Sequence, residues 1–476
     1  MTKRQVGLIG LGPMGAGLAT NLSGKGIEVV AWDRDIEPSN LGSWADGNNF
    51  RGCGSLHEVV SVLEAPRCIL LSIPNGAPVD QVLEQLTPHL SPGDVVADCG
   101  NSYFEDSVRR EQWLKEAGIE FLAVGVSGGP DGARHGPSIM VGGSPAGWDA
   151  IRPVFEEIAA TADGDPCCGY LGGAGAGHFV KMVHNGIEYA IMHLLMEACA
   201  VLERACGFST DQIADAFTSM NSGLNKGYLT EITASVVSVR APGEDQLLID
   251  IIDNAAEQKG TGRWAVQTAL DLGVPVPTIS EAVMYRQMSA ATFPENSQQT
   301  AADKRCLAPV SNPTELDALL PDALTAAFIS TFSQGLELCA NASERIGDDL
   351  DIAEILRVWR RGCILQGELV NHLWAAFPNE KGDGSSGRDV LHWKEVTPLL
   401  EKGTDSLRRV VAGAALAGIP CTGFASALGY IESKLGEPLP TALLQLQRDC
   451  FGRHGLRDKR TGERIVVQWH QGSEGP

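Results

Sequence analysis

The first third of the chain alternates short apolar runs with amphipathic helical patterns. Strands that helices cover on both faces are apolar throughout, so such runs predict a parallel sheet. Each run ends near Gly, Asn, Asp or Pro, where the chain turns toward the next helix. The alternation predicts an α/β fold with a Rossmann-type doubly wound parallel sheet. The predicted strands are Gln5–Gly10, Ile27–Trp32, Arg67–Ile73, Asp94–Asp98 and Ile119–Val124.

The pattern changes near residue 177, where the strand-like runs give way to long helical patterns. Apolar residues recur every three or four positions in Phe179–Ala198, which predicts one long amphipathic helix. We therefore predict a dinucleotide-binding domain at 1–176, a large all-α domain at 177–435 and a C-terminal tail at 436–476.

A weak internal repeat runs through the helical region. The segment Ile213–Gly223 matches Ile352–Gly362 at an offset of 139 residues, and Gly273–Tyr285 matches Gly418–Tyr430 at an offset of 145. Matching landmarks at a nearly constant offset indicate a duplicated helical unit. The second copy lacks the polar strip described below, so we expect it to be mainly structural.

Composition and charge narrow the functional classes. The chain has 476 residues, of which 43% are hydrophobic, and it contains no run of about 18 apolar residues that would predict a membrane span. A net charge of -22 argues against nucleic acid and anionic membranes as partners. The 12 cysteines have no metal-ligand spacing, and the N-terminus lacks a signal-peptide pattern. These features predict a cytoplasmic protein without a bound metal.

The first predicted strand runs into a glycine-rich turn and then a helix. The turn has the spacing GxGxxG, and Asp33 follows 18 positions after its last glycine. Glycines in this setting let the backbone approach a pyrophosphate at the helix N-terminus. The alternative is a tight turn in an unrelated α/β unit. The predicted cofactor-binding residues, including two at later strand ends, are Gly10, Leu11, Gly12, Pro13, Met14, Gly15, Asp33, Arg34, Asp35, Asn75 and Asn101.

One face of the predicted helix Phe179–Ala198 is polar. Lys181, His184, Asn185 and Glu188 follow the spacing i, i+3, i+4, i+7, which stacks them along roughly 10 Å of one face. A base, an imidazole, an amide and an acid on one wall favour a catalytic site. The alternative is a solvated face with ordinary ion pairs.

Further candidate ligands for an anion lie in the helical region and the tail. Lys259 and Thr261 stand among glycines, which suits phosphate binding, although an ordinary polar loop has the same composition. Arg286 lies near the end of an amphipathic segment, where it would also be favourable as a C-terminal charge. The segment 448–460 is basic in an acidic chain, and it is either a solvated tail or an arm that contacts another subunit.

These motifs together resemble the decarboxylating 6-phosphogluconate dehydrogenase family, over essentially the whole chain. The resemblance rests on Gly10–Gly15, Gly125–Gly129, Gly175–Tyr189, Gln258–Gly262 and Gln447–His454. It implies oxidative decarboxylation of 6-phosphogluconate to ribulose 5-phosphate with NADP, in the pentose phosphate pathway. It also implies a homodimer in which the tail of each chain reaches the active site of its partner.

The resemblance implies a role for each matching residue. Lys181 would be the general base for the C3 hydroxyl, and Glu188 would be the acid that protonates C1. The sugar acid would be held by Asn101, Ser127, Gly128, Gly129, His184 and Asn185. The phosphate would be held by Tyr189, Lys259, Thr261, Arg286 and, from the partner chain, Arg448 and His454.

Five positions depart from the family pattern. Cys99, Cys450 and Gly455 stand where the family usually has Gly, an aromatic residue and Thr. The second strand ends in Asp33-Arg34-Asp35, where NADP-using members typically have Asn-Arg-Thr. Asp33 is placed like the ribose-binding carboxylate of NAD enzymes, whereas Arg34 favours a 2′-phosphate. NADP is the predicted cofactor, and NAD is the alternative.

Two other functions remain open from the sequence. One is a related 3-hydroxyacid dehydrogenase, but such chains are far shorter and lack the second helical copy and the basic tail. The other is a catalytically silent protein that binds a nucleotide or sugar phosphate, which would not need both Lys181 and Glu188.

Overall fold

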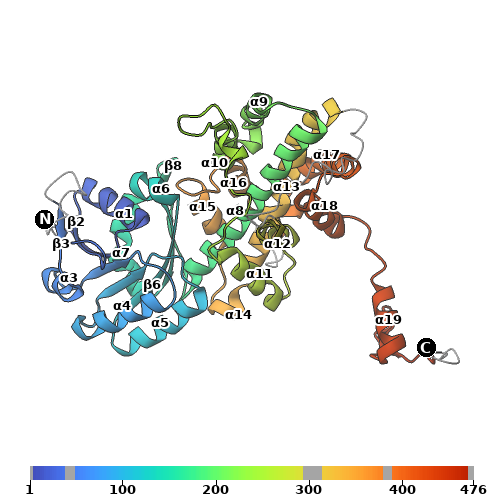
Figure 1. The fold of residues 1–476 in the computed structure, drawn as a ribbon. Helices are drawn as coiled ribbons and strands as arrows, with labels where there is room; N and C mark the ends of the chain where they lie inside the picture. The colour runs from blue at the N-terminus through green and yellow to red at the C-terminus, as the bar shows by residue number, and fades with distance from the viewer. Residues whose placement is uncertain (1–3, 38–48, 293–312, 379–388, 470–476) are drawn as a thin grey trace. The chain divides into compact units, whose positions relative to one another are not determined.

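The computed structural model describes residues 4–37, 49–292, 313–378 and 389–469, and the chain forms two compact units, 1–428 and 429–476. The larger unit begins with a β-sheet that is packed between helices (Figure 1). The sheet has eight strands in the order β10-β7-β6-β5-β4-β1-β2-β3. The strands are β1 (Gln5–Ile9), β2 (Glu28–Trp32), β3 (Phe50–Gly52), β4 (Cys68–Leu71), β5 (Val95–Asp98), β6 (Glu120–Ser127), β7 (Ser138–Gly143) and β10 (Cys168–Gly172).

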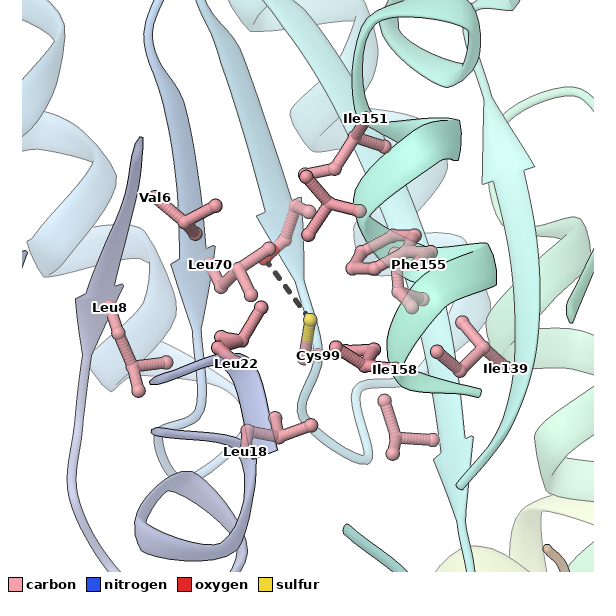
Figure 2. Close-up of a cluster of buried hydrophobic side chains, with 14 of the residues drawn as sticks. Val6, Leu8, Leu18, Leu22, Leu70, Cys99, Ile139, Ile151, Phe155 and Ile158 are labelled. Carbon is pink, nitrogen blue, oxygen red and sulfur yellow. Dashed lines mark hydrogen bonds between the residues drawn. The ribbon is translucent and has the colours of Figure 1, made fainter. Parts of the chain in front are cut away.

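Helices cover both faces of this sheet. They are α1 (Pro13–Gly24), α3 (Leu56–Val62), α4 (Ala77–Leu86), α5 (Phe104–Glu116), α6 (Gly129–His135) and α7 (Pro145–Ile158). Successive strand residues point to opposite faces, so Val6 and Leu8 belong to one core cluster and Ile9 to the other. Figure 2 shows α1 and α7 placing Leu22 and Phe155 in the first cluster. The predicted Rossmann-type fold is confirmed.

The sheet is parallel except at one strand pair, which the sequence did not predict. β7 runs antiparallel to β6, while the other neighbours in the sheet are parallel. β7 reads Ser-Ile-Met-Val-Gly-Gly and β3 has only three residues, so neither carries the long apolar run that predicts a strand. The five predicted strands are all present, and the strand predicted at Ile119–Val124 continues to Ser127 as β6.

The long helix α8 (Ala176–Ala200) packs directly on the sheet. A Cβ atom on Gly125 would lie 2.5 Å from the Cβ atom of Lys181, and a Cβ atom on Gly177 would lie 2.1 Å from the carbonyl oxygen of Ala123. Only glycines fit at these approaches. The glycines upstream of the predicted helix therefore seat α8 against β6 and β7, and they fix the position of Lys181 relative to the strand ends.

The rest of the larger unit is helical. Its principal helices are α9 (Thr210–Met220), α10 (Tyr228–Val236), α11 (Thr261–Leu272), α12 (Pro277–Thr292), α13 (Pro313–Ala340), α15 (Ile352–Trp359), α16 (Glu368–Ala376), α17 (Thr397–Leu416) and α18 (Thr422–Leu435), the last of which crosses into the smaller unit. None of the helices in the described ranges has the length and apolar character that a membrane span requires.

Two equivalent loops of the proposed repeat meet in this region. Gly227, just before α10, forms an antiparallel bridge with Gly367, just before α16. The Tyr228 amide donates to the Gln366 carbonyl at 3.1 Å, and the Glu368 amide donates to the Lys226 carbonyl at 2.8 Å. This symmetric pairing of corresponding residues supports the predicted duplication.

Candidate active site

The glycine-rich turn after β1 fits a dinucleotide. Gly10 has a φ of +92°, and a Cβ atom there would lie 2.4 Å from the Ser72 carbonyl oxygen. A Cβ atom on Gly15 would lie 2.1 Å from the carbonyl oxygen of Gly10, whereas Gly12 faces open space. The turn is therefore tightly packed on the sheet side and accessible at Gly12 and the N-terminus of α1, where a pyrophosphate can be bound.

A cavity of about 420 Å³ lies between this turn, the end of β2 and the segment after β4. Gly10, Gly12, Asp33, Arg34 and Asp35 line it. It lies between β1 and β4, where the strand order reverses and doubly wound sheets bind their ligands. The structure thus brings the predicted glycines and the predicted β2 residues to one pocket.

The carboxylate of Asp33 is occupied by backbone donors. It accepts hydrogen bonds from the amides of Leu11 at 2.7 Å and of Asp35 at 2.9 Å. Arg34 forms an exposed ion pair with Asp35, with 3.1 Å between Nη2 and Oδ2. This contact raises the pKa of Arg34 and lowers the pKa of Asp35. Asp33 therefore ties the glycine-rich turn to the end of β2, a contact that the sequence did not predict.

A larger cavity of about 680 Å³ extends from the glycine-rich turn to α8. It brings together most of the predicted site residues, from elements that are far apart in the sequence. Those on its wall are Gly12, Pro13, Met14, Asn101, Ser127, Gly128, Gly129, Lys181, Asn185, Glu188, Tyr189, Lys259 and Thr261. The wall runs from the glycine-rich turn to the polar face of α8. The cavity can therefore hold a hydride donor and a hydride acceptor next to each other.

Lys181 and Glu188 are both largely withdrawn from solvent on this face. Lys181 is 7% exposed. Burial lowers the pKa of Lys181, and the nearby Glu188 opposes that shift. Burial likewise raises the pKa of Glu188, opposed by Lys181 and Arg286. Desolvation thus favours a neutral amine and a neutral carboxyl group, the forms in which these groups act as general base and general acid.

His184 is fully buried between the two. Its ring contacts Ser127 Oγ at 3.2 Å through Nε2 and Asn185 Oδ1 at 3.3 Å through Nδ1, and Nδ1 lies 3.8 Å from Glu188 Oε2. Burial, together with the charge of Lys181, holds the pKa of His184 well below its ordinary value. A neutral imidazole here can orient hydroxyl groups without adding charge. Its ring also packs edge-on against Trp359.

A group of polar side chains borders the cavity near Tyr189. Asn185 Nδ2 donates to Thr261 Oγ1 at 3.2 Å. The Arg286 guanidinium lies over the Tyr189 ring, with Cζ 4.0 Å from the ring centroid, and its Nη1 donates to the Glu257 carbonyl at 2.9 Å. Tyr189 and Arg286 are thus fixed as a pair beside Thr261, in an arrangement suited to an anion.

The loops that follow β4 and β5 are held by a network of hydrogen bonds, part of which is buried. Asn75 Nδ2 donates to the Asn101 carbonyl at 2.8 Å. Behind them Arg110, fully buried on α5, donates to the Gly76 carbonyl at 3.0 Å and pairs with Asp98 at 3.4 Å. Sequence reasoning missed Arg110 and Asp98, because a polar residue on a helix or at a strand end gives no sign of burial until its distant partners are known.

The second helical copy also contributes to the site. Ile364 lines the larger cavity. A Cβ atom on Gly128 would lie 2.5 Å from the Gly362 carbonyl oxygen, and the Ser138 amide donates to that oxygen at 2.9 Å. The second copy therefore supports and lines the site in addition to its structural role. The sequence marked Gly362 as a matching position of the repeat, but it did not show that Gly362 contacts the loop at Gly128.

Comparison with known proteins connects this geometry to a family. Residues 5–172 match the model of the NAD binding domain of 6-phosphogluconate dehydrogenase, and residues 177–469 match that of the 6-phosphogluconate dehydrogenase C-terminal domain. The chain belongs to the 6-phosphogluconate dehydrogenase family.

Individual relatives match over nearly the whole chain. A decarboxylating 6-phosphogluconate dehydrogenase of Schizosaccharomyces pombe is 40% identical over 96% of this chain and 93% of its own length. An NADP(+)-dependent, decarboxylating 6-phosphogluconate dehydrogenase of Bacillus subtilis is 38% identical over 95% of this chain and 96% of its own. The 6-phosphogluconate dehydrogenase structure of Plasmodium falciparum, solved apo and in complex with its cofactor NADP+ and its substrate 6-phosphogluconate, superposes with a TM-score of 0.91 at 31% identity, covering 98% and 100% of the two chains.

Cys99, where the family usually has glycine, is accommodated by the core. Its thiol lies in the hydrophobic cluster with Leu18 and Ile158, and the sulfur is 3.7 Å from the Ala97 carbonyl oxygen (Figure 2). Burial raises the pKa of this thiol far above its ordinary value. Cys99 also lines the larger cavity, but its thiol packs in the core and its raised pKa disfavours the reactive thiolate form.

The remaining predicted residues, Arg448 and His454, lie in the smaller unit on and just after α19 (Ala442–Gly452). Their assignment to the phosphate site stays a prediction. Of the other departures, Cys450 is exposed on α19, and Gly455 has a φ of +84°. A threonine would be strained in that conformation, so glycine suits this turn. Among the described residues no cluster of His, Cys, Asp or Glu suitable for a metal ion was found.

Proposed function

We propose that this chain catalyses the oxidative decarboxylation of 6-phosphogluconate to ribulose 5-phosphate and carbon dioxide, with reduction of NADP. The observation that carries the proposal is the single cavity that contains Lys181 and Glu188 on one face of α8 and the glycine-rich turn at its other end. A cytoplasmic location belongs to the same proposal and rests on the scattered cysteine pattern of the sequence.

The proton transfers follow from the buried pair. Neutral Lys181 accepts the proton of the C3 hydroxyl group. A bound NADP would supply the hydride acceptor for C3, and the glycine-rich turn and the end of β2 would hold it. Lys181 then donates a hydrogen bond to the new C3 carbonyl oxygen, which takes up the electron pair released when the C1–C2 bond breaks and carbon dioxide leaves. Protonated Glu188 donates a proton to the carbon that had carried the carboxylate. His184, Asn185 and Ser127 orient the substrate hydroxyl and carboxylate groups.

The phosphate end of the substrate is assigned to the polar group beside Tyr189. Thr261, Lys259 and Arg286 supply a hydroxyl, an ammonium and a guanidinium, which suit a dianion. Arg448 and His454 from a second copy of the chain complete this clamp in the proposal. Support for a homodimer comes from the exposed apolar side chains of the tail, where Leu439 is 74% and Phe451 is 77% exposed.

The proposed reaction is tested by product analysis. Incubation with 6-phosphogluconate and NADP is expected to yield ribulose 5-phosphate, carbon dioxide and NADPH in equal amounts. Accumulation of a 3-keto acid without carbon dioxide would instead favour a 3-hydroxyacid dehydrogenase. Binding of both ligands without turnover would favour a silent binding protein.

The choice between NADP and NAD is predicted to depend on both carboxylates at the end of β2. Removing the charge in Asp33→Asn or Asp35→Asn is expected to raise the NADP-to-NAD ratio of kcat/KM about five- to tenfold, because a carboxylate beside the 2′-phosphate is repulsive. Asp35→Asn acts by releasing Arg34 for the 2′-phosphate. Asp33→Asn also weakens the anchor of the glycine-rich turn, so NAD use should fall.

The measurement is kcat/KM with each cofactor, together with calorimetric binding of 2′,5′-ADP to the enzyme. Glu37→Gln, an exposed carboxylate just beyond the same strand end, is the matched control. If the NADP-to-NAD ratio of kcat/KM is unchanged in both Asp variants, the end of β2 does not contact the 2′-phosphate of the ribose.

Sharing of the site between subunits is predicted to give complementation. Lys181→Met and Arg448→Ala homodimers should each be nearly inactive at low substrate. A heterodimer of the two has one site with both native residues, so about half of the wild-type activity is expected in a symmetric dimer. The activity of tag-purified heterodimers is the measurement. No recovery would mean that each tail serves its own chain.

A further inference from the structure

The smaller unit is organised around a buried carboxylate. Asp449 on α19 is only 5% exposed, whereas Leu443 and Leu444 on the same helix are 55% and 58% exposed. Asp449 is also the one residue of α19 that is buried. Within α19 the charged side chain is therefore inside and the leucines are outside, although the part of α18 in this unit buries Tyr430 and Ile431.

Two N–H groups satisfy that carboxylate. Asp449 Oδ1 accepts from the Gly455 amide at 2.6 Å, and Oδ2 accepts from the indole Nε1 of Trp469 at 2.8 Å. A buried carboxylate is stable only when such donors compensate for its lost hydration. A cavity of about 450 Å³ lies between α19 and the segment 464–469, and the bond to Trp469 is a contact that spans it.

The same bonds fix the turn that carries His454. Arg453 has a φ of +50° and its amide donates to the Asp449 carbonyl at 2.8 Å, while Gly455 has a φ of +84°. The residues on both sides of His454 are therefore anchored to Asp449. The His454 ring lies over Gly452, where a Cβ atom would come within 2.4 Å of Nε2. Arg448 directly precedes Asp449 on the helix.

We propose that Asp449, bridged to Trp469, is a positioning residue that holds Arg448 and His454 in the arrangement that binds the substrate phosphate. The inference rests on the proposed function of the tail. It adds that the bond between Asp449 and Trp469 keeps the tail in its binding conformation. Arg448 and His454 would lose conformational freedom upon binding if the tail were flexible, and an ordered turn removes most of that loss before the substrate arrives.

The test compares Asp449→Asn and Trp469→Phe with Arg448→Ala in the full-length enzyme. Asp449→Asn is expected to raise the KM for 6-phosphogluconate on the order of tenfold, the size expected for a lost hydrogen bond to a charged group. Trp469→Phe should give a smaller increase. The KM for NADP and the slow turnover of gluconate, which has no phosphate, should not change. Inhibition by inorganic phosphate should weaken in the same proportion.

The matched control is Asp458→Asn, because Asp458 is a carboxylate of the same unit that contacts Arg460 rather than the His454 turn. If Arg448→Ala leaves the KM for 6-phosphogluconate unchanged, the phosphate role of the tail fails. If Arg448→Ala raises it but Asp449→Asn and Trp469→Phe behave as wild type, the positioning role is overturned. Equal losses with gluconate and 6-phosphogluconate would also overturn it, since they would indicate a general structural defect. Should Asp449→Asn not fold, Trp469→Phe decides alone.

Discussion

Replacing Lys181 by Met is expected to lower kcat by about 10² to 10⁴-fold, the usual contribution of a general base. The methionine keeps the length and apolar stem of the side chain, so α8 should still pack against Gly125. NADP should bind as before, because the glycine-rich turn and the end of β2 lie at the other end of the cavity. The loss should therefore appear in kcat and not in cofactor affinity.

Initial rates and calorimetric NADP titration of the variant measure the two quantities. Lys115→Met, an exposed lysine on α5, is the matched control and should behave as wild type. Near-full turnover of Lys181→Met would contradict the assignment of the base.

Glu188→Gln is expected to cause a loss of similar size with a different pH dependence. The wild-type rate should fall at low pH as Lys181 becomes protonated, and at high pH as Glu188 loses its proton. Burial lowers the first pKa and raises the second, which moves both limbs toward neutral pH. Glutamine cannot ionise, so the high-pH limb due to this group should disappear in the variant. Its persistence would show that another group is the acid.

The sequence was sufficient for the parts of the site that depend on local spacing. Lys181, Asn185 and Glu188 were predicted to share a wall from helical periodicity, and all three line one cavity. Gly10 and Gly12 were predicted from a motif with a defined strand–turn–helix context. Such features can be predicted from the sequence because the geometry of a helix or a tight turn is fixed within a few residues.

The sequence was insufficient wherever a side chain found its partner far along the chain. Asp33 was predicted to face the ribose, yet its carboxylate already accepts the Leu11 and Asp35 amides. Trp359 packs on His184 from a helix that begins more than 150 residues later. Neither contact has a local signature, because it depends on how the sheet and the helical copies pack together.

Discrimination against unphosphorylated gluconate is expected to be the other large effect. A charge-assisted hydrogen bond contributes about 1.5–3 kcal/mol, so losing two of them predicts a kcat/KM for gluconate lower by about 10²–10⁴-fold. Arg286 and Thr261 are already ordered beside Tyr189, by the cation–π contact and by the hydrogen bond from Asn185. Most of the phosphate binding energy is therefore available without reordering these side chains.

Arg286→Met should separate this role from general packing. The variant loses the guanidinium but retains an apolar group over the Tyr189 ring, so kcat/KM for 6-phosphogluconate should fall about 10- to 100-fold. The value for gluconate should stay constant, since that substrate never used the guanidinium. Arg240→Met, which removes an exposed arginine paired with Asp245, is the matched control. Because a phosphate-specific contact must change the ratio of the two substrates, equal loss with both would assign Arg286 to the support of Tyr189 and leave the phosphate to Lys259, Thr261 and the tail.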